Sequence, residues 1–463
     1  MKTSLTFLFS LLVIVLACKK DSFITSPDAR VNITEDTLHF DTIFTSTGSV
    51  TQFFKIINEN NQKLKISSIK LMGSTSSSFK INVDGTPGPE VNNLELEAND
   101  SLYVFVSVSI NPNAANLPFI ITDSIEINFN GTKQKVQLEA WGQNAHFFRN
   151  KKITVSESWS NDLPYVILGF LQVDTNATLT INKGCRIYTH ADAPWLVEGS
   201  LVVNGEKDSI DRVFFRGDRL DEPYRDFPAN WPGIYFRPTS RNNVLNFAII
   251  KNAYQAIAIE DPSVNANPKI TLNECIIDNA YDAGIIAINS SIKATNCLIS
   301  NCGTNILLVK GGDYQFTHCT VVSYSNFYIL HKEPVLLVSN FININNVPVT
   351  ANLNAIFRNC IFWGENGTVE NEVIVAKAGS TAFNVLFDHS LLKTMPLNSI
   401  DSQSLLNQPP LFDSVNTSIQ YYDFHLKPNS PGINYGVNAG VTLDLDGRSR
   451  PVGLPDLGSY EFR

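Results

Sequence analysis

The sequence predicts an all-β protein in which short antiparallel strands precede a solenoid of stacked parallel coils. Residues 31 to 143 alternate apolar and polar side chains between Gly, Asn and Pro turns, which is typical of strands in a sandwich. From Asn246 to Val322 one short phrase with a strand-like core recurs at a period in the twenties, as expected for coils that bury their apolar faces against each other. No segment after residue 143 carries the 3.6-residue apolar stripe and caps of a helix.

Length and composition bound the class of protein. A chain of 463 residues is too long for one ordinary core, so two or three domains are expected. Hydrophobic residues make up 43% and charged residues 17%, which is typical of a globular protein. The formal net charge is −9 and no Lys/Arg cluster occurs, which argues against nucleic acid as a partner.

The N-terminus has the layout of a secretory signal. Lys2 precedes an apolar run from Leu5 to Ala17, which is too short to cross a membrane. The run ends in VLAC, and this segment resembles a bacterial lipoprotein signal peptide with Cys18 at the lipidated position. The following KKDS is similar to the surface-export signal of Bacteroidetes lipoproteins.

That resemblance implies a signal peptide at 1–17 and a lipidated tether at 18–30. It also implies an outer-membrane location, with the protein held by acyl chains and exposed at the cell surface. The alternative is a plain cleaved signal in which Cys18 has no such role.

Residues 31–143 contain runs that predict seven or eight short strands in an antiparallel β-sandwich. The runs are TLHFDTIF, TQFFKIINE, LKISSIKLM, FKINVDG, LELEAND, LYVFVSVSI, DSIEINFNG and KVQLEAWGQ. Three longer phrases, FFKIINENNQKLKISSIKL, LEANDSLYVFVSVSI and VQLEAWGQN, resemble the Ig-like sandwiches of the ASH/MSP type. The segment contains no cysteine, so an immunoglobulin disulfide is not expected.

Residues 144–405 are expected to form the coils. The phrases ATLTINKGCRIYT, WLVEGSLVVNGEKDSIDRVFFRGDR and NWPGIYFRP resemble the first coils of bacterial right-handed parallel β-helices of the pectin-lyase-like superfold. The repeats NFAIIKNAYQA and NECIIDNAYDA follow, and NCIFWG and DHSLLK continue them. Residues 406–463 include DFHLKPNSPGINYG, DLDGRSRP and DLGSYEF, which resemble the closing segment of Bacteroidetes surface β-helix proteins. This segment is expected to lie along the last coils or to cap them.

Stacking converts sequence spacing into columns of equivalent residues, about 4.8 Å apart. One predicted inward column consists of Ala248, Cys275, Cys297, Cys319, Cys360 and Ser390. Its cysteines are expected to be buried thiols rather than disulfides. No CxxC or HxxxH pair occurs, so no metal site is predicted. Asn252, Asn279 and Asn301 form a second column, which predicts an asparagine ladder at a turn.

A third column faces outward by alternation although it is almost wholly apolar. It consists of Ile249, Ile276, Leu298, Thr320, Ile361 and Leu391. A continuous apolar stripe open to water is unusual on a soluble protein. Either the assigned alternation is wrong or this face is covered. We expect a cover, supplied by the long insertion from Tyr328 to Leu353, by the C-terminal segment or by the sandwich.

Candidate catalytic residues are the acids Asp278, Asp282 and Glu260 and the bases Lys251 and Arg358. Parallel β-helix enzymes either bind Ca²⁺ and use Lys or Arg as the base, or hydrolyse glycosidic bonds with paired Asp residues. Here no two carboxylates repeat in adjacent coils, and the expected hydrolase phrases are absent. The alignment of Lys251 with Asp278 instead predicts an ion pair between adjacent coils. We therefore favour a protein without catalytic activity over an enzyme. No cofactor is expected, except Ca²⁺ if the protein is a lyase.

Tyr254, Tyr281 and Trp363 are the candidate ligand-binding residues, because sugars are held by aromatic faces and amide groups. The resulting hypothesis is a surface lipoprotein that presents its β-helix to a polysaccharide or a host or cell-surface glycan, without catalysis. The alternatives are a polysaccharide lyase or glycoside hydrolase, and a structural envelope or adhesin component. The lipid anchor would be the contact with the membrane.

Overall fold

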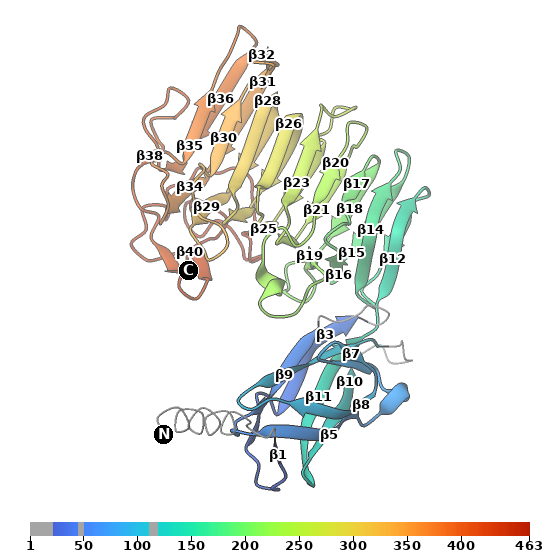
Figure 1. Ribbon diagram of the computed structural model, residues 1–463. Coiled ribbons are helices and arrows are strands. Elements are labelled where there is room, and N and C mark those ends of the chain that lie inside the picture. Colours follow the sequence, from blue (N-terminus) through green and yellow to red (C-terminus); the bar gives the residue numbers. More distant parts are fainter. Residues whose placement is uncertain (1–21, 45–50, 111–118) are drawn as a thin grey trace, which may run out of the picture. The chain divides into compact units, whose positions relative to one another are not determined.

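The computed structural model describes residues 22–44, 51–110 and 119–463 (Figure 1). The chain divides into two compact units, residues 1–144 and 145–463. Both units are built from strands, and the described residues contain only two short 3₁₀ turns, η1 (Ser74–Ser76) and η2 (Tyr224–Asp226). Within the described ranges, no helix has the length and apolarity of a membrane span. Cys18 and the rest of the predicted signal lie outside the described residues.

The N-terminal unit consists of two sheets around one apolar core. One sheet has the order β2-β4-β9-β6-β7, formed by β2 (Val31–Ile33), β4 (Gln52–Asn58), β9 (Ser101–Val108), β6 (Phe79–Val83) and β7 (Thr86–Pro87). The other has the order β1-β5-β10-β11-β3 with β8 paired to β5; its strands are β1 (Phe23–Ile24), β5 (Lys63–Leu71), β10 (Phe119–Phe129), β11 (Thr132–Gln143), β3 (Thr37–Phe44) and β8 (Glu90–Leu96). Side chains from both sheets, including Phe54, Val104, Ile127 and Leu138, share the core. All eight predicted runs form strands.

Most strand pairs in this unit are antiparallel, as predicted, but two are parallel. Strand β3 pairs with β11 in parallel, with Thr37 opposite Gln137, and β1 pairs with β5 in parallel. Alternation predicts which face of a strand is buried, and it carries no information on the direction of the neighbouring strand. The two parallel pairs were therefore outside what the sequence pattern could predict.

The C-terminal unit is a parallel β-helix with three faces. The first face contains β13 (Glu157–Trp159), β15 (Thr178–Asn182), β18 (Ser200–Asn204), β21 (Asn243–Asn246), β24 (Ile270–Asn273), the second halves of β26 (Ala283–Thr295) and β28 (Thr304–Thr317), β33 (Leu353–Arg358) and β36 (Phe383–Asp388). The second face contains β16 (Arg186–Thr189), β19 (Val213–Gly217), β22 (Ala248–Lys251), β25 (Ile276–Asp278), β27 (Leu298–Ser300), β29 (Thr320–Tyr324), β34 (Ile361–Glu365), β37 (Leu391–Leu392) and β38 (Leu405–Leu406).

The third face contains β17 (Trp195–Val197), β20 (Ile234–Phe236), β23 (Gln255–Glu260), the first halves of β26 and β28, β30 (Leu336–Ser339) and β35 (Val373–Ala376). Strands β12 (His146–Ile153) and β14 (Tyr165–Val173) bend so that each contributes to the second and third faces. The long insertion supplies β30 and a separate hairpin of β31 (Phe341–Ile344) and β32 (Val347–Thr350).

The predicted interior columns are confirmed. Cys275, Cys297, Cys319 and Cys360 are fully buried, and all six cysteines in the described ranges are free. Burial raises the pKa of the Cys275, Cys297 and Cys319 thiols well above the ordinary value, so these three thiols stay protonated and unreactive.

The asparagine column has the predicted left-handed backbone, with φ of 62°, 58° and 53° at Asn252, Asn279 and Asn301. Asn279 Nδ2 donates to Asn252 Oδ1 (2.9 Å), which forms the expected ladder. The ladder ends at Asn301, whose Oδ1 instead accepts from the backbone N–H of Tyr324 (3.1 Å).

The C-terminal segment covers most of the outward apolar column. Leu298, Ile361 and Leu391 are buried in a second core with Phe412, Phe424, Leu426, Leu445 and Leu457 of this segment, and Ile276 packs against it half-buried. The segment contributes a hairpin of β39 (Phe412–Asn416) and β40 (Tyr421–Leu426) (Figure 1). Of the three expected covers, the C-terminal segment is therefore the one that supplies this core.

Charged side chains of the closing motifs hold this segment to the coils and to itself. Arg450 and Glu461 form an ion pair (2.9 Å) in which neither side chain is exposed to solvent. Arg450 also donates to Asn296 Oδ1 of the coils (3.0 Å). Asp456 accepts the backbone N–H groups of Asn434 (2.6 Å) and Phe462 (2.5 Å). The acidic and basic residues of DLDGRSRP and DLGSYEF thus have structural roles.

We predict that Arg450→Met lowers the free energy of unfolding of the β-helix unit by about 3–5 kcal/mol, because Glu461 is left as a buried, unpaired charge. The double variant Arg450→Met/Glu461→Gln should recover a large part of this loss. Urea unfolding, followed together with the binding of a hydrophobic dye, measures both effects. A loss below about 1 kcal/mol for the single variant would contradict this role of the ion pair.

Candidate functional site

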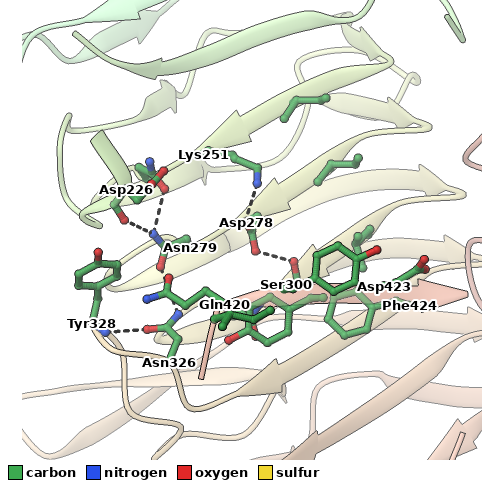
Figure 2. A pocket seen from close by; sticks show the side chains of 18 of the residues that line it. Asp226, Lys251, Asp278, Asn279, Ser300, Asn326, Tyr328, Gln420, Asp423 and Phe424 are labelled. Carbon is green, nitrogen blue, oxygen red and sulfur yellow. Dashed lines mark hydrogen bonds and ion pairs between the residues drawn. The ribbon is translucent and has the colours of Figure 1, made fainter. Parts of the chain in front are cut away.

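A groove of about 850 Å³ lies on the second face where the cover of the apolar column ends (Figure 2). Its floor is formed by Ile249, Ile276 and Leu298, which belong to three consecutive coils. Phe214 of the preceding coil extends this floor. Four coils are separated by three spacings of about 4.8 Å, so the floor is roughly 14 Å long.

Hairpin β39–β40 forms one wall of the groove. It contributes Tyr421, Tyr422 and Phe424 together with Ile419 and Gln420 of its turn. Phe424 is buried and stacks on Tyr324 of β29 (ring centroids 6.2 Å apart), which holds the hairpin against the coils. Tyr421 at the rim is 54% exposed. The wall therefore combines a fixed base with an accessible aromatic rim.

The loop from Asn326 to Tyr328 supplies another part of the lining. Asn326 Oδ1 accepts the backbone N–H groups of Tyr328 (2.8 Å) and Ile329 (2.6 Å), so the loop is shaped by its own asparagine. The Tyr328 ring contacts Phe227 (4.9 Å between centroids). Figure 2 shows Asn326, Tyr328 and Gln420 close to the asparagine turn of the coils.

The charged pair of the groove joins adjacent coils. Lys251 Nζ lies 3.0 Å from Asp278 Oδ2, and Ser300 Oγ donates to Asp278 Oδ1 (2.7 Å). The charge of Asp278 raises the pKa of Lys251 above its ordinary value, so the amine keeps its proton at neutral pH. Both oxygens of the Asp278 carboxylate are engaged within the protein.

The Tyr422 hydroxyl is a buried polar group without a hydrogen-bond partner among the described residues. Burial raises the pKa of Tyr422 to about 12, so the hydroxyl retains its proton. A buried, unpaired O–H is costly to the folded protein.

His425 links two carboxylates beside the groove. Its Nδ1 lies 2.5 Å from Asp423 Oδ1, and its Nε2 lies 3.0 Å from Asp446 Oδ2. Burial acts to lower the pKa of His425, but the hydrogen bonds to Asp446 and Asp423 outweigh it, and the pKa is raised. His425 is consequently held in its cationic form more firmly than a free histidine.

Only two of the predicted catalytic residues, Lys251 and Asp278, line the groove, and the predicted ion pair between them is present. The other three lie on different faces with separate partners. Glu260 pairs with Arg237 (3.1 Å), Asp282 accepts from Gln255 Nε2 (2.6 Å), and Arg358 pairs with Asp388 (2.6 Å). The five candidates therefore do not form one catalytic centre.

The predicted ligand-binding aromatics are also divided. Tyr254 and Tyr281 stack with their ring centroids 5.9 Å apart and are 44% and 54% exposed, outside the groove lining. Trp363 is only 4% exposed, because the C-terminal segment covers it, and its Nε1 donates to Glu365 Oε1 (2.9 Å). The expectation that Trp363 offers a ring face to a ligand is wrong, since the covering segment had not been placed from the sequence.

Several groove residues were missed from the sequence. Asp423 and His425 belong to the DFHLKP phrase, which had been interpreted only as part of a cap, and Asp226 lies in turn η2. The hairpin follows the coil residues of the groove by about 150 residues and shares no repeat with them, so the spacing in the sequence could not predict their contact. The exposed aromatic run at Tyr421 and Tyr422 was the available clue.

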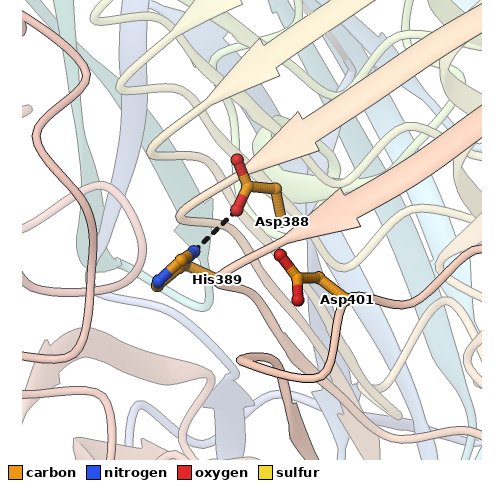
Figure 3. Close-up of side chains that lie close together, drawn as sticks. All are labelled: Asp388, His389 and Asp401. Carbon is orange, nitrogen blue, oxygen red and sulfur yellow. Dashed lines mark hydrogen bonds and ion pairs between the residues drawn. The ribbon is translucent and has the colours of Figure 1, made fainter.

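A group of possible metal ligands lies elsewhere on the coils, formed by Asp388, His389 and Asp401 (Figure 3). Their donor atoms lie within 4.8 Å of one another. However, Asp388 already pairs with His389 Nδ1 (2.6 Å) and with Arg358 (2.6 Å). The Arg358 cation disfavours a metal ion at the same carboxylate, so we assign no metal to this group.

Comparison with known families agrees with the coil geometry. Residues 170–321 match the model of the family described as right handed beta helix region. This match runs from β14 to β29, and the coils are those of a right-handed parallel β-helix, as predicted. No curated protein matches the chain.

Solved structures give only partial likenesses. A family 123 glycoside hydrolase from Clostridium perfringens is 13% identical, with 28% of this chain and 30% of that chain covered and a TM-score of 0.20. The ASH/PapD-like domain 7 of human CEP192 is 14% identical, with 26% of this chain and 89% of that chain covered and a TM-score of 0.18. The chain thus spans less than a third of the hydrolase. At these TM-scores neither likeness supports a statement about function.

We predict that the stability supplied by His425 falls as the pH rises. Since the folded-state pKa is raised, this contribution is fully present below the unfolded value of about 6.5 and is lost as the pH passes through the folded-state pKa. Melting temperatures of the native protein and of His425→Gln, compared between about pH 5 and pH 9, should converge toward alkaline pH. A difference that stays constant across this range would contradict the prediction.

Proposed function

We propose that this protein is a lipid-anchored cell-surface protein whose β-helix binds a glycan in the groove without turning it over. The observation that carries the proposal is the lining itself. Aromatic side chains come from the hairpin, from the Asn326 to Tyr328 loop and from the coils, and amide side chains lie between them. Sugar rings present apolar C–H faces and hydroxyl edges, which such a lining complements.

Polar groups in the groove support this assignment. Asn326 and Gln420 contribute amides beside Asn279 (Figure 2). The amides of Asn252, Asn279 and Asn301 are buried and already hydrogen-bonded within the protein, so they shape this edge of the groove. The exposed Tyr421 at the rim adds a hydroxyl that a sugar oxygen can reach. A mixture of neutral donors and acceptors over an apolar floor suits a polyhydroxylated ligand better than a purely apolar one.

The state of Lys251 and Asp278 argues against catalysis at this site. A general base must lose its proton before it accepts another, and the raised pKa of Lys251 opposes this loss. Asp278 is held by Lys251 and Ser300 through both of its oxygens. We therefore favour binding over a polysaccharide lyase or a glycoside hydrolase.

A glycan array probed with the ectodomain tests the proposal. The bound glycans are then incubated with the protein, and products are followed as new reducing ends and as the ultraviolet absorbance of unsaturated sugars. Binding without products supports the proposal. Formation of products would show that the protein is an enzyme, and failure to bind any glycan would contradict the proposed function.

We predict that Tyr421→Ala and Tyr328→Ala each weaken glycan binding roughly tenfold or more, because each variant removes an aromatic surface of the groove worth about 1.5 kcal/mol. The matched control is Tyr254→Ala/Tyr281→Ala, which removes two exposed tyrosines outside the groove and should change affinity less. Isothermal calorimetry with the best array glycan measures both. A larger loss of affinity in the control would indicate that the glycan binds at Tyr254 and Tyr281 instead of in the groove.

The anchor is tested separately. We predict that Cys18→Ser moves the protein from the membrane fraction to the soluble fraction of its host and abolishes labelling with a fatty-acid analogue, because the acyl chains attach to this thiol. Glycan binding by the released protein should be unchanged, since the groove lies in residues 214–460. Retention in the membrane fraction without a label would contradict lipid anchoring at Cys18.

A further inference from the structure

We propose that the groove selects uncharged glycans and excludes acidic polysaccharides such as polyuronates and sulfated chains. This inference rests on the proposed function and adds the chemical class of the ligand. It follows from the charges that face the groove and from the partners that already occupy them.

Every cation lining the groove is already paired with a carboxylate. Lys251 is paired with Asp278 (3.0 Å), and His425 lies between Asp423 (2.5 Å) and Asp446 (3.0 Å). Recognition of an anionic sugar depends on charge-assisted hydrogen bonds from Lys or Arg to its carboxylate or sulfate. Both ring nitrogens of His425 face carboxylates, so it has no N–H left for a ligand. Lys251 keeps further N–H donors, but Asp278 balances its charge, so a second anion would compete with that carboxylate.

The lining contains more carboxylates than cations. Asp226, Asp278 and Asp423 face Lys251 and His425, so the charge balance of the groove lining is slightly negative. Asp226 is further paired with Arg225 (3.2 Å) outside the lining. Arg216, another cation near Lys251, donates to the backbone carbonyl of Arg225 (3.1 Å). An acidic chain entering the groove would meet repulsion and would lose its own hydration without gaining a cation.

The remaining surface suits an uncharged chain. The floor of Ile249, Ile276 and Leu298 can pack against the C–H faces of sugar rings. The half-buried Gln420 amide and the exposed Tyr421 hydroxyl offer neutral hydrogen-bonding groups beside a floor roughly 14 Å long. These contacts are little affected by salt, in contrast to those of an acidic-polysaccharide site.

The test compares affinity for neutral oligosaccharides with affinity for oligogalacturonates and sulfated oligosaccharides, at low and at moderate salt. Neutral ligands are expected to bind with an affinity that salt changes less than about twofold, and acidic ligands are expected to bind at least about tenfold more weakly. Preferential, salt-sensitive binding of acidic ligands would overturn the inference and leave the proposed function standing. Binding of no glycan would remove the proposed function itself.

A charge-releasing variant gives a second, independent readout. Asp278→Asn keeps the side-chain shape and frees Lys251, so binding of acidic oligosaccharides should strengthen roughly tenfold. The matched control is Asp282→Asn, four residues away and outside the groove lining, which should give no such gain. Circular dichroism and urea unfolding establish that both variants are folded. A folded Asp278→Asn variant with no gain for acidic ligands would contradict the role assigned to the ion pair.

Discussion

The outward apolar column of the second face is the constraint on which the rest of the β-helix unit depends. The alternation that sends Ile250 and Ile277 into the coil interior places Ile249 and Ile276 on the outer face, where Ile249 is 8% exposed and Ile276 is half-buried. Burying one such side chain is worth about 1.5–3 kcal/mol, so a whole exposed column would be a considerable liability. The C-terminal segment meets this constraint from Leu298 to Leu391. Its hairpin stands beside the half-buried Ile276, and the groove lies where this second core ends.

The cover itself depends on polar contacts. An apolar segment laid over a sheet has few directional contacts that fix its position, and the closing motifs supply them through buried charged groups. Arg450 reaches Asn296, and Asn359 exchanges hydrogen bonds with the backbone of Val437 (2.7 and 2.9 Å). Ser459 donates its backbone N–H to Thr320 Oγ1 (2.9 Å). These contacts fall on three different coils, so they fix the position of the segment along the coils and hence where the groove lies.

Contacts between residues that lie one coil repeat apart could be predicted from the sequence. Cys275 and Cys297 were assigned to one buried column, and Lys251 was paired with Asp278, because a parallel coil brings residues one period apart into contact. The need for a cover could also be predicted from the apolar column. The groove could not, because its two walls are separated by a long stretch of chain with no shared repeat. Trp363 was misassigned for the same reason, and the parallel pairing of β3 with β11 left no trace in the alternation.

The same register that makes the columns also constrains the chemistry of this face. Equivalent positions in neighbouring coils are so close that an acid and a base placed one period apart form an ion pair, as Lys251 and Asp278 do. The hydroxyl of Ser300, one period further on, donates a hydrogen bond to the second oxygen of the Asp278 carboxylate. A catalytic acid or base needs the opposite arrangement, in which a group is kept from its neighbours and poised near neutral pH. In the groove Lys251, Asp278 and Ser300 satisfy one another, whereas the wall of the hairpin keeps an exposed aromatic surface at Tyr421. Recognition by ring faces and neutral hydrogen bonds is therefore the chemistry that this surface has left to offer.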